Sequence, residues 1–255
     1  MKTNIKVLEK VKFKNPILVE GLPGIGNVGR VAAGYMISQL KMKKFAELYS
    51  PHFLPLVIMQ PNGVAVSLKN EFYYVKNKKN DIIVLTGDTQ SISPEGHYDV
   101  CENILDFSQS LGVKTVIALG GFAEGKPVSD PKIIGAVNDK ALLKKYNKYD
   151  IKFAKDQMVG TIIGASGLLL GLGAARGMEG IALLGQTMGF PLVTDPKAAD
   201  RILQVISRIL KVTIDLSKLE NIISEMDDHL KKTDIIHRQT LDQLTKQKED
   251  VRYIG

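Results

Sequence analysis

The chain has 255 residues, enough for one large domain or two small ones with a sizeable buried core. Hydrophobic residues make up 44% of the chain and charged residues 24%, as in ordinary soluble proteins. The formal net charge is +7, and the lysines form small clusters without interleaved stacking aromatics. We therefore expect these lysines to form a solvated surface, and we expect no nucleic-acid partner.

The cysteine count and the distribution of apolar residues indicate in which cellular compartment the protein resides. The single cysteine, Cys101, excludes an internal disulfide framework, and we expect it to be a buried small hydrophobe. Residues 1–14 are charged and lack the apolar core of a signal peptide. Residues 158–172 are the most apolar stretch, but they are glycine-rich and too short to span a bilayer. The sequence predicts a cytoplasmic protein with no membrane partner.

Histidines and acids form no obvious ligand set. The four histidines are scattered, and His229 and His237 have no acidic ligands at a suitable spacing. We expect no metal site and no cofactor.

The first expected elements are a strand from Ile17 to Val19, a glycine-rich turn and a helix ending near Leu40. Asn27 is the expected cap of this helix. The turn contains four glycines: Gly21, Gly24, Gly26 and Gly29. Helix N-termini after such turns attract anions, so this turn either holds a ligand or joins a strand tightly to a helix.

The next segments read as short strands separated by turns. Strands are expected at residues 45–50, 56–59, 64–68 and 72–75. Residues 61–63 (PNG) and 69–71 (KNE) have turn chemistry typical of hairpins. The sequence therefore predicts an antiparallel meander within a mixed sheet.

A strand–helix–strand unit follows. Residues 81–88 read as a buried strand, and Ser93 and Pro94 begin a helix as cap and first-turn residue. Residues 115–119 form the next buried strand, followed by a loop that starts at Gly120. The expected inner face of the helix comprises Tyr98, Cys101, Ile104, Leu105, Ser108 and Leu111.

The last third alternates strands and helices before a charged ending. We expect an extended segment at 133–137, a short helix ending at Tyr146, a core helix within 160–178, a strand at 180–187 and a helix capped by Asp195. Residues 217–220 (SKLE) have the spacing of a capping box. The expected organisation is a core domain at 1–212, a helical extension at 213–250 and a flexible tail at 251–255.

One candidate ligand crevice follows from these elements. Gly24, Gly26 and Gly29 match the dinucleotide fingerprint, but the required acid, Glu47, falls inside a strand and hairpins follow it. Asp88 and His97 belong at the carboxyl end of a strand, where a weak acid–base cluster or merely an exposed helix start would form. Ser166 fails the spacing of a nucleophile elbow, so no catalytic residue is expected.

Four separated motifs resemble one family. They are EGLPGIGNVGRVAA at 20–33, DIIVLTGDTQ at 81–90, ALGGF at 118–122 and GASGLLLG at 164–171. These motifs are similar to the archaeal proteasome assembly chaperone family, homologous to eukaryotic proteasome assembly chaperone 2, over about residues 5–210. The resemblance implies a three-layer α/β/α sandwich with a mixed sheet, of the phosphorylase/hydrolase-like type. It also implies a non-enzymatic homo-oligomer that binds α-subunits of the proteasome core particle.

The resemblance also directs attention to Tyr253, Ile254 and Gly255. Family members that engage the proteasome use a terminal hydrophobic–tyrosine–any motif, whereas here the tyrosine is third from the end and follows an arginine. A terminal peptide with one aromatic anchor is able to bind a pocket, although a frayed end is the simpler alternative.

The leading hypothesis is a proteasome assembly chaperone or adaptor. A proteasome activator using the same tail is one alternative. A nucleotide- or small-molecule-dependent enzyme using the turn between Gly24 and Gly29 is another.

Overall fold

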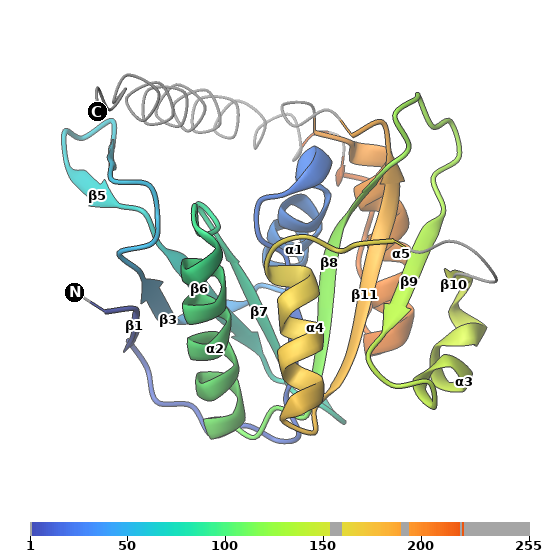
Figure 1. The fold of residues 1–255 in the computed structure, drawn as a ribbon, viewed down its shortest axis with the longest axis horizontal. Helices are drawn as coiled ribbons and strands as arrows, with labels where there is room; N and C mark the ends of the chain where they lie inside the picture. The colour runs from blue at the N-terminus through green and yellow to red at the C-terminus, as the bar shows by residue number, and fades with distance from the viewer. Residues whose placement is uncertain (1, 154–159, 190–193, 220, 222–255) are drawn as a thin grey trace, which may run out of the picture.

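The computed structural model describes residues 2–153, 160–189, 194–219 and 221, which form a mixed sheet between two helical layers (Figure 1). Within these residues the sheet has nine strands in the order β1-β3-β6-β7-β2-β8-β11-β9-β10. Their bounds are β1 (Asn4–Val7), β2 (Ile17–Glu20), β3 (Lys43–Tyr49), β6 (Asn70–Val75), β7 (Ile82–Gly87), β8 (Thr115–Ala123), β9 (Ile133–Val137), β10 (Ile151–Phe153) and β11 (Glu179–Thr187).

The centre of the sheet is parallel. β2 pairs with β7 and β8, and β8 pairs with β11. These strands read as continuous apolar runs because helices cover both faces. β6, β3 and β1 extend one side by antiparallel pairing, while β9 runs antiparallel to β11 and carries β10 parallel to itself. The predicted mixed sheet is confirmed.

In the described part of the chain, two long helices cover each face of the sheet. α1 (Val28–Gln39) and α5 (Pro196–Leu210) enclose one apolar core, and α2 (Pro94–Ser110) and α4 (Ala165–Ala175) enclose the other. Figure 1 shows α2 and α4 together in front of the sheet, with α1 and α5 behind it. The residues that the structure describes also contain three short helical segments: η1 (Ile25–Asn27), α3 (Leu142–Tyr146) and η2 (Asn147–Tyr149). The predicted three-layer α/β/α sandwich is confirmed.

Local capping signals explain where two helices begin. The Ser93 side chain accepts a hydrogen bond from the Gly96 amide at 3.1 Å, and Asp195 accepts one from the Ala198 amide at 3.0 Å. Both helices carry proline in the first turn, where a missing amide hydrogen costs nothing. Both predicted starts are confirmed.

Two details of the predicted helices need correction. Asn27 is the N-cap residue of α1, as predicted, but its backbone is left-handed and its side chain makes no capping hydrogen bond. Tyr98 was placed on the inner face of α2, yet it is 53% exposed. Buried Val100 and Cys101 instead lead the inward face, because the apolar stripe of α2 starts one turn later.

The predicted meander was also wrong in part. β4 (Val57–Met59) and β5 (Ala65–Ser67) form a separate two-stranded hairpin. Residues 69–71 are not a hairpin turn, because β6 begins at Asn70 and pairs with β3 and β7 on both sides. β8 likewise continues through Gly120 to Ala123, since β11 supplies a partner along its whole length. The sequence did not indicate β1 or β10.

The chain returns to the core after α5. Leu219 is buried in the core that α1 and α5 enclose, and the Tyr35 hydroxyl donates to the Asp215 carbonyl oxygen at 2.5 Å. Residues 220 and 222–255 lie outside the described residues, which places most of the expected helical extension and the whole tail there. The domain boundary at residue 212 therefore stays a prediction.

Candidate functional site

The glycine turn after β2 is shaped first by close packing. A Cβ atom on Gly29 would lie 2.2 Å from the Leu119 carbonyl oxygen, and one on Gly21 would lie 2.3 Å from the Gly29 carbonyl oxygen. Both contacts are with backbone, which has little freedom to move away. Gly26 takes a φ of +60°, and its added Cβ would lie 3.0 Å from Thr187 Oγ1. The turn therefore joins β2 and α1 tightly to β8.

A cavity of about 470 Å³ lies beside this turn, at the carboxyl ends of β2, β8 and β11. This edge is where open α/β sheets commonly bind ligands. Most of the lining is apolar, including Leu22, Phe122 and Ile162, while Gln90, His97 and Ser166 supply polar groups. The structure thus brings together part of the predicted crevice: Gly24, Gly29 and His97 line the cavity.

The other two predicted crevice residues have different surroundings. Gly26 and Asp88 are not among the described residues that line this cavity. The Asp88 carboxylate accepts a hydrogen bond from the Lys69 amide at 3.0 Å, and the Asp88 amide donates to the Lys69 carbonyl oxygen at 3.0 Å. Asp88 therefore ties the end of β7 to the start of β6. His97 Nδ1 lies 3.0 Å from the Ser93 carbonyl oxygen, inside its own helix turn.

Glu20 is a polar residue of this edge that the sequence did not single out. It is fully buried, and its carboxylate accepts hydrogen bonds from the Leu22 amide and the Ser166 hydroxyl, both at 2.9 Å. Burial raises the pKa of Glu20 to about 7, against the opposing effect of these two donors. The available signal was a carboxylate placed directly after the apolar run of β2.

Gln90 fastens the glycine turn to α4 across the same cavity. Its Nε2 donates to the Pro23 carbonyl oxygen at 2.6 Å, and its Oε1 accepts from the Ala165 amide at 2.9 Å. The first turn of α4 is thereby held by a side chain from the loop after β7. Ser166 belongs to that turn and donates to Glu20, as a residue of a packed polar junction.

The dinucleotide interpretation lacks its acidic residue. Glu47 lies on β3, which β6 and β7 separate from β2. Its carboxylate accepts hydrogen bonds from the ammonium groups of Lys69 at 2.6 Å and Lys44 at 2.9 Å. These bonds outweigh burial and lower the pKa of Glu47 to about 2. Glu47 therefore has no access to a ribose held at the glycine turn.

The structure also bears on the expectations for Cys101, for metal ligands and for membrane-spanning helices. Cys101 is buried as predicted, and burial raises the pKa of its thiol to about 12. The described residues contain no group of three or more His, Cys, Asp or Glu able to hold a metal ion. In the same part of the chain, every helix is too short or too polar to cross a membrane. Tyr253, Ile254 and Gly255 lie outside the described residues.

Comparisons with known proteins agree over most of the chain. The model of the PAC2 family matches residues 18–233. The uncharacterized protein MJ1210 of Methanocaldococcus jannaschii is 36% identical over 253 residues, which cover 98% of this chain and 96% of that protein.

Two solved structures from Pyrococcus furiosus share the fold. PbaB, described as an archaeal proteasome activator, is 40% identical, with a TM-score of 0.82 and coverage of 91% of this chain and 99% of PbaB. PbaA, described as an archaeal homolog of proteasome-assembly chaperone, is 25% identical, with a TM-score of 0.75 and coverage of 94% and 99%. With sequence and fold matched over most of its length, this chain belongs to the PAC2 family.

Proposed function

We propose that this protein binds the α-subunits of the proteasome core particle and acts on the assembled particle as an activator. The observation that carries this choice is the identity of 40% with the activator PbaB over 91% of the chain. Identity with PbaA, the homolog of proteasome-assembly chaperone, is 25% over a similar share. Assembly chaperone is the second candidate, supported by that likeness.

A non-catalytic role is part of the proposal. The Ser166 hydroxyl is engaged with a buried carboxylate, and His97 lies against the carbonyl oxygen of Ser93. A serine nucleophile needs a base within hydrogen-bond reach that is itself oriented by a third group. Glu20 is within reach of Ser166, but it is fully buried and its other carboxylate oxygen accepts from the Leu22 amide. The polar groups at the carboxyl edge therefore support a role in fastening α4 to the glycine turn.

The proposed contact with the proteasome is the segment that contains Tyr253 and Ile254. These residues form an apolar pair after a long charged stretch. A single aromatic side chain that enters a preformed pocket is able to dominate the binding energy of a short peptide.

We also propose that the protein forms a homo-oligomer and that the β4–β5 hairpin contributes to the contact between its subunits. Figure 1 shows this hairpin projecting from the main sheet. Its exposed apolar side chains are Val57, Met59 and Val64, with exposed fractions of 57%, 78% and 53%. Clustered exposed apolar residues on a protruding element are typical of protein–protein contacts.

The test is binding of the full chain to purified core particles and to isolated α-rings. Tyr253→Ala is expected to weaken binding to both, because the aromatic anchor is lost. Tyr98→Ala is the matched control, since it removes an exposed tyrosine from the body. Equal binding by the Tyr253→Ala variant would move the contact to the body. No binding by the unmodified chain would overturn the proposed function.

A further inference from the structure

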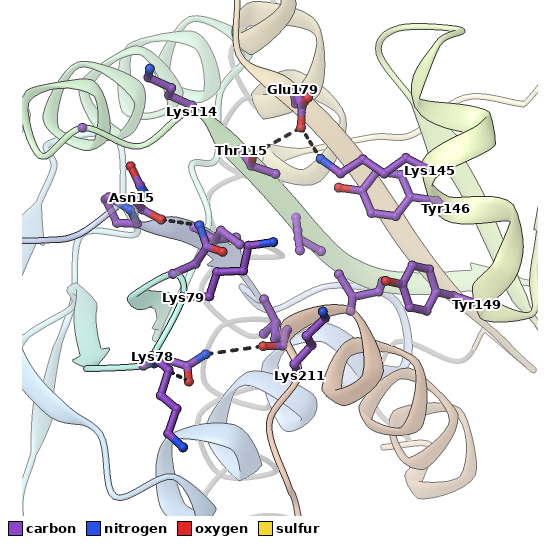
Figure 2. A pocket seen from close by; sticks show the side chains of 18 of the residues that line it. Asn15, Lys78, Lys79, Lys114, Thr115, Lys145, Tyr146, Tyr149, Glu179 and Lys211 are labelled. Carbon is purple, nitrogen blue, oxygen red and sulfur yellow. Dashed lines mark hydrogen bonds and ion pairs between the residues drawn. The ribbon is translucent and has the colours of Figure 1, made fainter.

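A second cavity, of about 870 Å³, lies at the edge of the sheet opposite the glycine turn. Its walls come from the amino ends of β2, β8 and β11, the segment between β6 and β7, and α3 with η2. The carboxyl ends of α2, α4 and α5 complete the lining through Gly112, Gly177 and Leu210. Segments far apart in the sequence therefore surround one depression (Figure 2).

Positive charge dominates this lining. Six lysines contribute to it: Lys78, Lys79, Lys114, Lys145, Lys148 and Lys211. Glu179 is the acid of the described lining, and it is engaged by the Lys145 ammonium and the Thr115 hydroxyl. The formal charge of the lining is therefore +5. Neither Lys79 nor Lys211 has an ion-pair partner within the described residues.

The lysines enter the depression from different sides. In Figure 2, Lys79 and Lys145 point toward its middle from opposite walls, and Lys211 approaches from the end of α5. Lys78 and Lys114 extend away from the centre at the rim. A lysine side chain has four carbons and many accessible rotamers, so rim lysines are able to turn toward a bound anion.

The negative ends of the helix dipoles offset only part of the positive charge of this lining. Each helix C-terminus carries a partial charge of about −0.5, and cations near it are favourable. Three such ends amount to roughly −1.5, which leaves an excess of more than three positive charges. Like charges held around one depression repel each other, so the arrangement is relieved by an anionic ligand.

The geometry points to a compact polyanion. We propose that this cavity binds a chain of phosphate groups, either inorganic polyphosphate or the triphosphate of a nucleotide. The volume falls in the range of small-molecule sites, and the lysines surround a centre instead of following a line. An acidic peptide or a nucleic-acid strand would be matched by charges along an extended groove. Lysine ammonium groups are point charges that suit phosphates without a fixed bidentate geometry.

The test is isothermal titration calorimetry of the full chain with tripolyphosphate at about 0.1 M salt, where screening acts over about 10 Å. The unmodified chain is expected to bind. Lys79→Gln/Lys211→Gln is expected to bind about tenfold more weakly, as the loss of two exposed charge contacts implies. Lys126→Gln/Lys132→Gln is the matched control, because it removes equal charge from the segment between β8 and β9, and it is expected to bind as the unmodified chain does.

Further variants and ligands distinguish inorganic polyphosphate from a nucleotide and show whether a loss of binding reflects misfolding. Lys79→Arg/Lys211→Arg is expected to retain binding, because the charge is kept. ATP without Mg²⁺ binding as tightly as tripolyphosphate would assign the phosphate chain alone, and much tighter binding would assign a nucleotide. Absence of binding, or equal binding by the double glutamine variant, would overturn the proposal. Tighter binding of an acidic peptide or a single-stranded oligonucleotide of equal charge would also overturn it.

Discussion

Glu20 and Ser166, which are 146 positions apart in the chain, meet through a hydrogen bond of 2.9 Å between Ser166 Oγ and Glu20 Oε2. The bond links the carboxyl end of β2 to the first turn of α4. It holds a carboxyl group with no exposed surface in the middle of the carboxyl edge. Buried carboxyl groups and closely packed glycines of this kind determine how the stability of the protein depends on pH and on substitution.

The first prediction concerns the pH dependence contributed by Glu20. Its folded pKa, about 7, lies above the ordinary value of 4.5, so the folded state binds this proton more tightly than the unfolded state. The free energy of unfolding should therefore fall as pH rises from about 4.5 to about 7, by roughly 3 kcal/mol from this group. Glu20→Gln should remove that fall. Urea denaturation of both proteins across this range measures the difference, and parallel curves would contradict the account.

Glu47 predicts the opposite dependence in acid. Its folded pKa, about 2, lies below the ordinary value of 4.5, so its contribution is complete above about 4.5 and is lost as pH falls toward 2. Glu47→Gln should lower the free energy of unfolding at neutral pH by about 1–3 kcal/mol. The same variant should flatten the acid limb of the stability curve. An unchanged acid limb would show that Lys44 and Lys69 do not hold this carboxylate in solution.

A third prediction concerns the packing of the glycine turn. Gly29→Ala places a Cβ 2.2 Å from the Leu119 carbonyl oxygen, so backbone must shift and the free energy of unfolding should fall by about 3 kcal/mol or more. Gly171→Ala, in α4, has open space around its added Cβ and should raise stability by up to about 1 kcal/mol. Chemical denaturation compares the two. Similar effects from both variants would mean that the close approach of α1 to β8 is not fixed.

A fourth prediction concerns self-association. Val57→Asp/Met59→Asp should lower the molecular mass in solution, because charges replace exposed apolar side chains on the β4–β5 hairpin. Ile163→Asp is the control, since Ile163 is 87% exposed at a different place. Light scattering coupled to size exclusion measures the mass. An unchanged mass in the double variant would exclude the hairpin as the contact.

Local signals predicted those parts of the fold that local interactions decide. Ser93 and Asp195 cap the helices that their sequences indicate, and the strand–turn–helix unit around Gly24 forms as expected. The lengths of the strands and their pairing partners were harder to predict from the sequence. β8 extends through Gly120 because β11 lies beside it, and no local pattern encodes that neighbour.

The candidate sites also depend on contacts between distant segments, which local sequence patterns do not predict. Lys79 and Lys145 belong to two lysine clusters, at residues 76–79 and 140–148, which the sequence predicts to be separate solvated surfaces. The crossovers of the sheet bring these clusters to opposite walls of one cavity. The sequence did not indicate the burial of Glu20, because a carboxylate at the end of an apolar run is commonly exposed. Its burial depends on α4, which comes much later in the chain.

Peptide hydrolysis by preassembled core particles, with and without this protein, tests the central claim most directly. An activator should raise hydrolysis of a small fluorogenic peptide, and Tyr253→Ala should abolish most of that rise while Tyr98→Ala retains it. Unchanged hydrolysis by particles that demonstrably bind the protein would contradict activation and favour the assembly role.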